Sequence, residues 1–138
     1  MKADFKEVES LSFASDINEL SKAESLVDKI CQQLAINEDY YGNVLIAVTE
    51  AVNNAIRHGN KENKSKKVQI NVCDSELVFK ITVCDEGQGF DYYNLPDPTA
   101  PENIEKENGR GIFLMKSLAD SVQFNNNGRE VELTFSKN

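Results

Sequence analysis

The chain has 138 residues, of which 40% are hydrophobic and 28% are charged, and this composition is typical of a folded globular domain. Acidic side chains outnumber basic ones by 23 to 15, so the net charge of −8 disfavours a nucleic-acid partner. The amino-terminal residues lack a signal-peptide core, and no stretch approaches the roughly 20 apolar residues that cross a bilayer. We therefore expect a single cytoplasmic domain, residues 1–138, with no membrane partner.

The first half of the chain predicts one strand and two helices. Residues 7–14 alternate loosely, which indicates a strand, and residues 16–35 have helical spacing with Asp16 as the N-cap. A second helix follows Asn37 and is predicted to end at Gly59, a C-cap. The expected core stripe of this helix consists of Tyr41, Leu45, Val48, Val52 and Ala55/Ile56.

The second half predicts two hairpins with a helix between them. Residues 68–74 and 76–85 alternate with period two around a turn at Asp74-Ser75. Residues 111–120 have helical spacing, and residues 121–135 form two strands around the turn signal Asn126-Asn127-Gly128. Helices should cover one face of these strands. The residues on that face are Leu77, Phe79, Ile81 and Val83 in one hairpin and Val131, Leu133 and Phe135 in the other. The fold class is therefore α+β, a two-layer sandwich whose mixed, mostly antiparallel sheet is covered by helices on one face.

Residues 91–108 show neither period and contain all three prolines, Pro96, Pro98 and Pro101. Long irregular segments of this kind are commonly lids, binding loops or disordered regions. We expect a mobile cover over a site, with a plain surface excursion as the alternative. The three cysteines, Cys31, Cys73 and Cys84, have no C-x-x-C spacing and cannot all pair within one chain, so we expect reduced core thiols.

Polar side chains gather near the end of the second helix. Glu50 and Asn54 lie one turn apart and share a face opposite the core stripe, where a solvated surface is the simplest explanation. Asn53 and His58 add hydrogen-bonding groups, which favours a binding face as the alternative. We interpret His58 as a structural residue at the helix end, because one histidine without neighbouring cysteines or spaced carboxylates makes a poor metal site.

Asp85 continues the parity of Val83, so its carboxylate should point toward the covered face of the sheet, where it needs a partner. Gly87 and Gly89 follow it and allow the backbone to turn sharply or to approach a ligand. The Asp-x-Gly-x-Gly pattern therefore indicates a pocket floor, although a plain turn or a cation loop also fits.

Gly109, Arg110 and Gly111 directly precede the third predicted helix. The free N–H groups and the positive dipole end of a helix bind phosphate, even where the net charge of the chain is negative. Simple helix initiation is the alternative explanation of these glycines.

Taken in order, Glu50-x-x-x-Asn54, Asp85-x-Gly87-x-Gly89, the proline-rich loop and Gly109-x-Gly111 resemble the N box, G1 box, lid and G2 box of the GHKL ATPase superfamily. That superfamily includes gyrase, histidine kinases and mismatch-repair ATPases, and the resemblance covers essentially the whole chain. The short length and the segments TEAVNNAIRHGN, Pro-Asp-Pro and GRGIFLMKSLAD are similar to the anti-sigma-factor serine/threonine kinases of bacterial partner-switching systems.

The resemblance implies the GHKL sandwich fold, with ATP and Mg²⁺ as cofactors. It implies that Asp85 accepts a hydrogen bond from the adenine amino group and that Gly87 and Gly89 shape the base and ribose pocket. Asn54 would coordinate Mg²⁺ between the phosphates. Glu50 would orient or deprotonate the attacking serine hydroxyl or water.

The resemblance also implies that Gly109, Arg110 and Gly111 hold the phosphates, with Lys106 as a possible further cation and the side chain of Arg110 free to face phosphate, lid or partner. The implied function is an ATP-dependent serine/threonine protein kinase that acts as an anti-sigma factor. It would phosphorylate an anti-anti-sigma protein on serine and sequester a sigma factor.

Two alternatives to this function stay open. The first is a non-catalytic module that binds ATP or ADP and regulates partner binding without phosphoryl transfer, and the second is an interaction domain with a vacant pocket. The presence of Glu50 favours the enzyme, because a pure binder needs no base. Proteins of this type commonly form homodimers, and the strand at residues 7–14 or the first helix would supply the surface.

Overall fold

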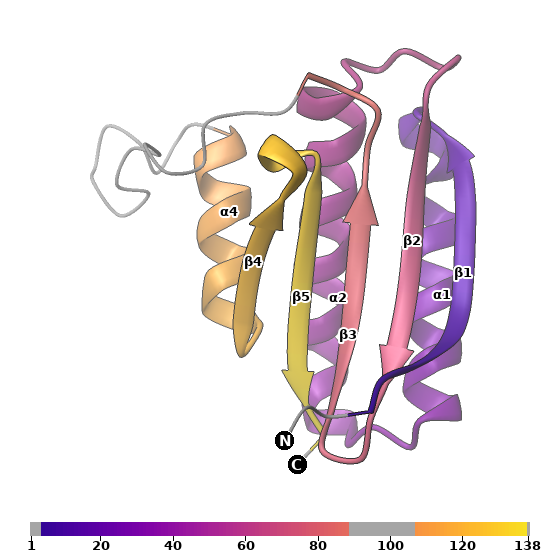
Figure 1. Cartoon of the computed structure of the whole chain (residues 1–138), viewed down its shortest axis with the longest axis vertical. Helices are drawn as coiled ribbons and strands as arrows, with labels where there is room; N and C mark the ends of the chain where they lie inside the picture. The colour runs from indigo at the N-terminus through magenta and orange to yellow at the C-terminus, as the bar shows by residue number, and fades with distance from the viewer. Residues whose placement is uncertain (1–3, 89–106, 138) are drawn as a thin grey trace.

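A computed structural model describes residues 4–88 and 107–137. Its centre is a five-stranded sheet in the order β1-β2-β3-β5-β4, with the helices packed on one face (Figure 1). The strands are β1 (Lys6–Ala14), β2 (Lys67–Asp74), β3 (Val78–Cys84), β4 (Ser121–Asn125) and β5 (Glu130–Ser136). The α-helices are α1 (Leu20–Gln33), α2 (Glu38–Asn54) and α4 (Glu107–Leu118). The predicted two-layer α+β sandwich is confirmed.

All four strand pairings among the described residues are antiparallel, so the expectation of a mixed sheet is wrong. The reason is that β2–β3 and β4–β5 are hairpins, and β5 returns beside β3 in the opposite direction. Both predicted turns are present. The second turn places Asn126, Asn127 and Gly128 at positive φ of 53°, 58° and 88°, a conformation that asparagine and glycine adopt more readily than other residues.

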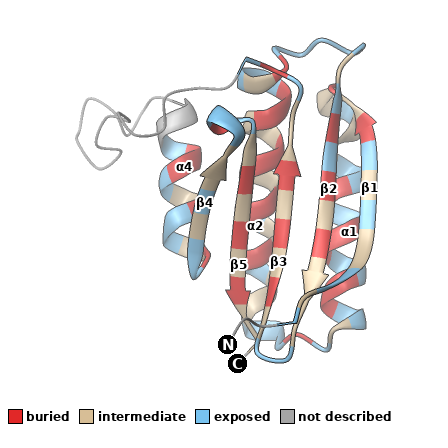
Figure 2. Cartoon of the chain, in the orientation of Figure 1, coloured by how far each residue is buried: buried red, intermediate tan, exposed pale blue. Residues whose placement is uncertain are grey.

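Alternate residues of β2, β3 and β5 are buried against the helices, as the period-two pattern predicts (Figure 2). The buried set includes Phe79, Ile81, Val83, Val131, Leu133 and Phe135. Leu77 was also expected on this face, but its side chain is 66% exposed. It precedes the first residue of β3 and belongs to the turn, where the alternation of the strand does not apply.

Helix α2 lies between α1 and α4, so it is covered on more than one side (Figure 1). Its predicted stripe is confirmed at Val48 and Val52, whereas Tyr41 and Leu45 are only partly buried. The buried surface extends instead to Val44, Ala47 and Ala51. A stripe predicted against the sheet alone misses the contribution of α4, which packs on the flank that carries Ala51.

Two helix starts match the sequence. The Asp16 carboxylate accepts a hydrogen bond of 3.0 Å from the Asn18 N–H and begins a short 3₁₀ turn (Ile17–Glu19) that leads into α1. The Asn37 side chain accepts one of 2.9 Å from the Asp39 N–H at the start of α2. Both are the N-cap arrangement that short polar side chains favour.

The helical stretch that begins with α2 ends at Gly59, as predicted, but the role of Gly59 as its C-cap is wrong, because the C-cap is Asn60. Helix α2 continues into a π-helical segment, Ala55–Gly59, and the Asn60 N–H closes this segment on the Ala55 carbonyl at 2.8 Å. Positive φ angles occur after it, at Lys61 and Glu62, while Gly59 has none. The glycine therefore serves a purpose other than the left-handed turn that usually ends a helix.

Helix α4 begins at Glu107, so the irregular segment predicted at residues 91–108 ends earlier than expected, and residues 91–106 lie outside the described residues. All three cysteines are free, as predicted, but only Cys31 is fully in the core. Within residues 4–88 and 107–137, no helix is both long and apolar enough to span a membrane.

Candidate functional site

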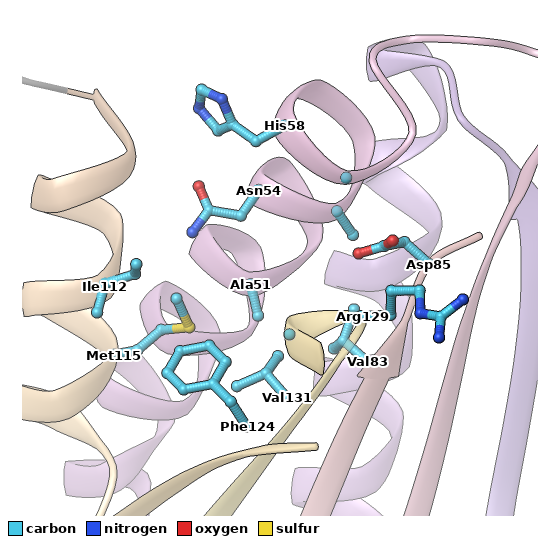
Figure 3. Close-up of a pocket in the computed structure, with 13 residues that line it drawn as sticks. Ala51, Asn54, His58, Val83, Asp85, Ile112, Met115, Phe124, Arg129 and Val131 are labelled. Carbon is cyan, nitrogen blue, oxygen red and sulfur yellow. The ribbon is translucent and has the colours of Figure 1, made fainter. Parts of the chain in front are cut away.

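A pocket of about 600 Å³, counting its open mouth, lies where β3 ends, between the carboxyl end of α2 and helix α4 (Figure 3). Most of its lining is apolar, and the larger apolar side chains are Val83, Ile112, Met115, Phe124 and Val131. The polar or charged residues of the lining are Asn54, His58, Asp85 and Arg129, and the guanidinium of Arg129 points away from the pocket (Figure 3). An open pocket with a mostly apolar lining and a few polar groups is the usual form of a small-ligand site.

Asp85 directly follows β3, and its carboxylate points into the pocket, as predicted (Figure 3). Burial raises the pKa of this carboxyl group, and the Gly87 N–H and the Arg129 charge only partly oppose the rise. Asp85 Oδ1 accepts a hydrogen bond of 2.8 Å from the Gly87 N–H, and the Asp85 N–H donates one of 2.9 Å to the Arg129 carbonyl. Because Asp85 also lines the pocket, its carboxylate faces a bound ligand there.

Two glycines make this position of Asp85 possible. A Cβ on Gly59 would lie 2.3 Å from Asp85 Oδ2, and a Cβ on Gly87 would lie 1.9 Å from the Gly59 carbonyl oxygen. Any side chain at either position would overlap with its neighbour. Gly59 is therefore a site residue that sequence reasoning assigned to helix termination. Gly87 lies at a close backbone contact and binds the Asp85 carboxylate through its N–H, a contact that the sequence did not predict, and Gly89 lies outside the described residues.

Glu50 and Asn54 do not lie on a solvated face, which was the simplest explanation of the pair. Helix α4 crosses α2 at Gly111, where a Cβ would lie 3.0 Å from Glu50 Oε2 and 3.4 Å from the amide nitrogen and oxygen of Asn54. Asn54 Oδ1 is buried and has no hydrogen-bond partner among residues 4–88 and 107–137. A buried oxygen of this kind is unfavourable unless a donor or a cation reaches it.

The predicted phosphate-binding glycines lie inside α4, since this helix starts at Glu107. The N–H groups of the first helical turn have no partner within the helix, and Gly109 belongs to this turn, whereas the Arg110 N–H is the first to be used within the helix. Gly111 is the fifth residue, so its N–H is used within the helix, and its lack of a side chain instead permits the close contact with Glu50 and Asn54. The Arg110 side chain is exposed.

His58 lies on the pocket rim one turn beyond Asn54, and its ring is exposed rather than packed in the core (Figure 3). His58 lies at the helix end, as the sequence predicts, and it also lines the pocket. Sequence reasoning also missed Phe124, Met115 and Arg129 in the lining. The helical spacing between Asn54 and His58 could have indicated that His58 lies beside the site. Phe124, Met115 and Arg129 are brought to the pocket only by the packing of α4 and the second hairpin.

The residues present fit a magnesium ion held mainly by a ligand. The described residues contain no group of three or more His, Cys, Asp or Glu side chains able to hold a metal ion by themselves. Mg²⁺ typically takes one or two protein oxygens and completes its shell with phosphate and water oxygens. The partnerless Asn54 Oδ1 is one such oxygen, close to the first turn of α4.

The sequence matches the family described as histidine kinase-like ATPase domain over residues 13–135. Serine-protein kinase RsbW of Oceanobacillus iheyensis is 30% identical, in an alignment that covers 70% of this chain and 65% of that protein. Serine-protein kinase RsbW of Staphylococcus epidermidis is 36% identical, with 64% of this chain and 72% of that protein covered. The chain thus spans just under two thirds of the first relative and somewhat more of the second.

A solved structure shares the fold. The crystal structure of the RsbU and RsbW domains of a Mycobacterium tuberculosis protein superposes with a TM-score of 0.62 at 11% identity, over 94% of this chain and 31% of that chain. The GHKL-type sandwich expected from the motifs is therefore confirmed at the level of the fold. With the match over residues 13–135 and the relatedness to RsbW serine-protein kinases, the chain belongs to the histidine kinase-like ATPase family.

Proposed function

We propose that the chain is an ATP-dependent serine/threonine protein kinase whose nucleotide occupies the pocket between α2, β3 and α4. One observation carries the proposal: an apolar pocket has a carboxylate, Asp85, on one wall and a partnerless buried amide oxygen, on Asn54, on another. A nucleotide has matching parts, since a flat apolar base carries hydrogen-bond donors at one end and phosphates lie at the other. The names of the RsbW relatives support the same class of enzyme.

In this proposal the base enters the apolar part of the pocket, beside Met115 and Phe124. The Asp85 carboxylate accepts a hydrogen bond from the adenine amino group, and Gly87 holds that carboxylate through its N–H. A hydrogen bond between a charged acceptor and a buried donor is stronger than a neutral one, so it selects a base with an amino group at this place.

The phosphates lie toward the first turn of α4, where the helix N–H groups without a partner in the helix, that of Gly109 among them, would bind them. Asn54 Oδ1 would hold Mg²⁺, whose charge neutralises the phosphate oxygens when it is bound. Glu50 lies one turn before Asn54 and accepts the proton of a serine hydroxyl. At the same time the serine oxygen bonds to the γ-phosphorus. The bond from that phosphorus to the bridging oxygen breaks, and ADP leaves.

The protein partners in this proposal are supported by the RsbW relatives, whereas the homodimer and the extent of the domain follow from the resemblance of the motifs alone. The phosphorylated protein is an anti-anti-sigma protein, the sequestered one is a sigma factor, and the whole chain of residues 1–138 acts as one nucleotide-binding domain that forms a homodimer. A non-catalytic ATP/ADP switch is the second candidate. It is favoured by one observation, because the Glu50 carboxylate packs against Gly111 and is not part of the described pocket lining.

The test combines thermal melting with ADP formation in the presence of Mg²⁺-ATP. A ligand at about 100 times its Kd should stabilise the folded chain by about 2.7 kcal/mol, so a clear rise in Tm is expected for the wild type. Asp85→Asn should lose this rise. Glu50→Ala should keep it but lose ADP formation and transfer to a protein substrate, because the nucleotide is still bound while the proton acceptor is gone.

Glu24→Ala is the matched control, since Glu24 is an exposed glutamate of α1 and its removal should change neither measurement. No rise in Tm for the wild type would refute the nucleotide site. A Glu50→Ala variant that still forms ADP at the wild-type rate would support the switch in place of the kinase.

A further inference from the structure

Asn60 is one of two buried polar residues in the described part of the chain, and the other is Ser15. Asn60 follows the π-helical segment, and only 1% of its surface is exposed. It does not line the pocket, and nothing in the proposed chemistry uses it. A buried amide that survives in a core needs partners for its two donors and its acceptor.

The Asn60 amide has all of these partners. Its Nδ2 donates to Ser15 Oγ at 2.5 Å and to the Lys67 carbonyl at 3.0 Å. Its Oδ1 accepts a hydrogen bond of 2.7 Å from the Glu86 N–H. The side chain therefore joins the end of β1 and the start of β2 to the residue that follows Asp85.

Several hydrogen bonds hold the turn at Asp85. The one that comes from a neutral side chain is supplied by Asn60. The Asp85 N–H is bonded to the Arg129 carbonyl, the Asp85 carboxylate to the Gly87 N–H, and the next peptide, at Glu86, to Asn60. The Glu86 carboxylate in turn accepts a hydrogen bond of 2.6 Å from the Lys67 N–H. Since Gly59 precedes Asn60 and contacts the Asp85 carboxylate, the same stretch of chain fixes the peptide and limits the position of the carboxylate.

From this geometry we infer that Asn60 is a positioning residue, which holds the Asp85 turn so that the pocket prefers a 6-aminopurine over a 6-oxopurine. This inference rests on the proposed nucleotide site and assigns to a residue outside the pocket the control of base selectivity. Adenine presents an amino donor to the carboxylate, whereas hypoxanthine presents a carbonyl oxygen, which the carboxylate repels. If the Asp85 turn moves away from the base, the hydrogen bond to the adenine amino group and the repulsion of the hypoxanthine carbonyl both weaken. The preference for adenine then falls, while the contacts to the phosphates persist.

The experiment measures the Kd values of Mg²⁺-ADP and Mg²⁺-IDP by calorimetry. The wild type should prefer ADP by about tenfold or more, the ratio expected for one hydrogen bond to a charged group. Asn60→Ala should weaken ADP binding and leave IDP binding nearly unchanged, so the ratio approaches one. Asn60→Asp keeps an acceptor for the Glu86 N–H and should keep a ratio closer to that of the wild type.

Ser15→Ala is the matched control, because it removes the Ser15 partner of the Asn60 amide but leaves the bond to Glu86 intact. It should leave the ADP to IDP ratio unchanged. Equal losses of ADP and IDP affinity in Asn60→Ala, or the same fall in ratio in Ser15→Ala, would show that Asn60 only supports the fold. Absence of any ADP binding by the wild type would instead refute the nucleotide site itself.

A second measurement needs no variant. Hydrogen exchange of the Glu86 amide in the wild-type chain should be slow, because its N–H is bonded to a buried acceptor. Exchange at the rate of an unstructured peptide would overturn the inference even if Asn60→Ala fails to fold.

Discussion

Single glycines show how strongly the site depends on the lack of a side chain. Gly42 and Gly59 belong to the same continuous helical stretch, yet a Cβ at Gly42 would meet no atom within 4 Å, while one at Gly59 would lie 2.3 Å from Asp85 Oδ2. Gly42→Ala should therefore stabilise the chain by about 0.5–1 kcal/mol, the gain in helix propensity. Gly59→Ala should lower the stability and abolish ADP binding, because Asp85 must move.

Chemical denaturation and ADP titration of the two variants check this prediction, and each serves as the control of the other. A Gly59→Ala variant with wild-type stability and ADP affinity would show that the contact with Asp85 is easily relieved.

At the residue scale the sequence predicted the direction of some side chains but not the contacts of others. The parity of β3 was enough to point Asp85 into the pocket, because the side-chain period of a strand is fixed by its backbone. The reason for Gly59 was missed, because its neighbour Asp85 is 26 residues further along the chain. Asn60 gave no signal for the same reason, since its partners Ser15, Lys67 and Glu86 lie in three separate segments.

The contact between helices α2 and α4 depends on Gly111. Alanine at this position gains helix propensity, but its Cβ would lie 3.0 Å from Glu50 Oε2, closer than side-chain atoms normally approach. We expect Gly111→Ala to change Tm by only a few degrees, because the two effects oppose each other. Phosphoryl transfer should fall much more than ADP affinity, because the displaced group is the proposed proton acceptor.

Melting temperature, ADP affinity and the rate of ADP formation from Mg²⁺-ATP check this prediction. Gly42→Ala is the control, since it gains helix propensity in α2 without any contact. A Gly111→Ala variant with the wild-type rate would show that Glu50 adjusts freely.

At the element scale the helices and strands were predictable, because each has a clear hydrophobic period and most have a capping or turn residue. The geometry at one helix end and the start of another helix were not. The second helical stretch ends at Gly59, as predicted, but it does so through the π-helical segment Ala55–Gly59, in which Gly59 makes room for the Asp85 carboxylate and is not a left-handed cap. Helix α4 starts before its glycines, because a helix tolerates glycine where packing against α2 requires a small residue.

The stability of the whole molecule should depend on pH through Asp85. Burial raises the pKa of its carboxyl group in the folded chain. For an acid with a raised pKa, the stabilising contribution is complete below the unfolded pKa, about 3.9, and is lost as pH rises through the folded pKa. At neutral pH the ligand-free chain is therefore destabilised by this carboxylate, and Asp85→Asn should raise its Tm while abolishing the response to ATP.

Asp16→Asn is the control, because the contribution of Asp16 to stability should depend on pH in the opposite direction. Both variants change the net charge from −8 to −7, but the Asn18 N–H lowers the pKa of Asp16, so its contribution is present at neutral pH and is lost on acidification. Melting curves of the ligand-free variants between acid and neutral pH test the pair. Parallel Tm changes in both variants would mean that net charge, and not the surroundings of Asp85, controls the effect.

At the scale of the whole molecule, the sequence predicted two layers and two hairpins but not the strand order. Alternation along a strand shows which residues face the helices, yet it does not show which strand pairs with which. The pairing of β3 with β5 joins segments separated by α4 and β4, and the pocket forms only after this pairing. Its members Phe124 and Met115 could therefore not be placed from the sequence.

The strand order also divides the molecule into two consecutive stretches of chain. Residues from β1 to β3, with α1 and α2, form one part, and α4, β4 and β5 form the other, with β3 and β5 paired at the junction in the sheet. The pocket is lined from both parts. Strand pairs between segments that are far apart in the sequence, such as β3 and β5, are slow to form. Consecutive stretches of chain can open locally as separate cooperative units. A ligand bound there ties the local unfolding of the C-terminal part to that of the N-terminal part, so the nucleotide state would decide whether the chain unfolds in one cooperative step or in two.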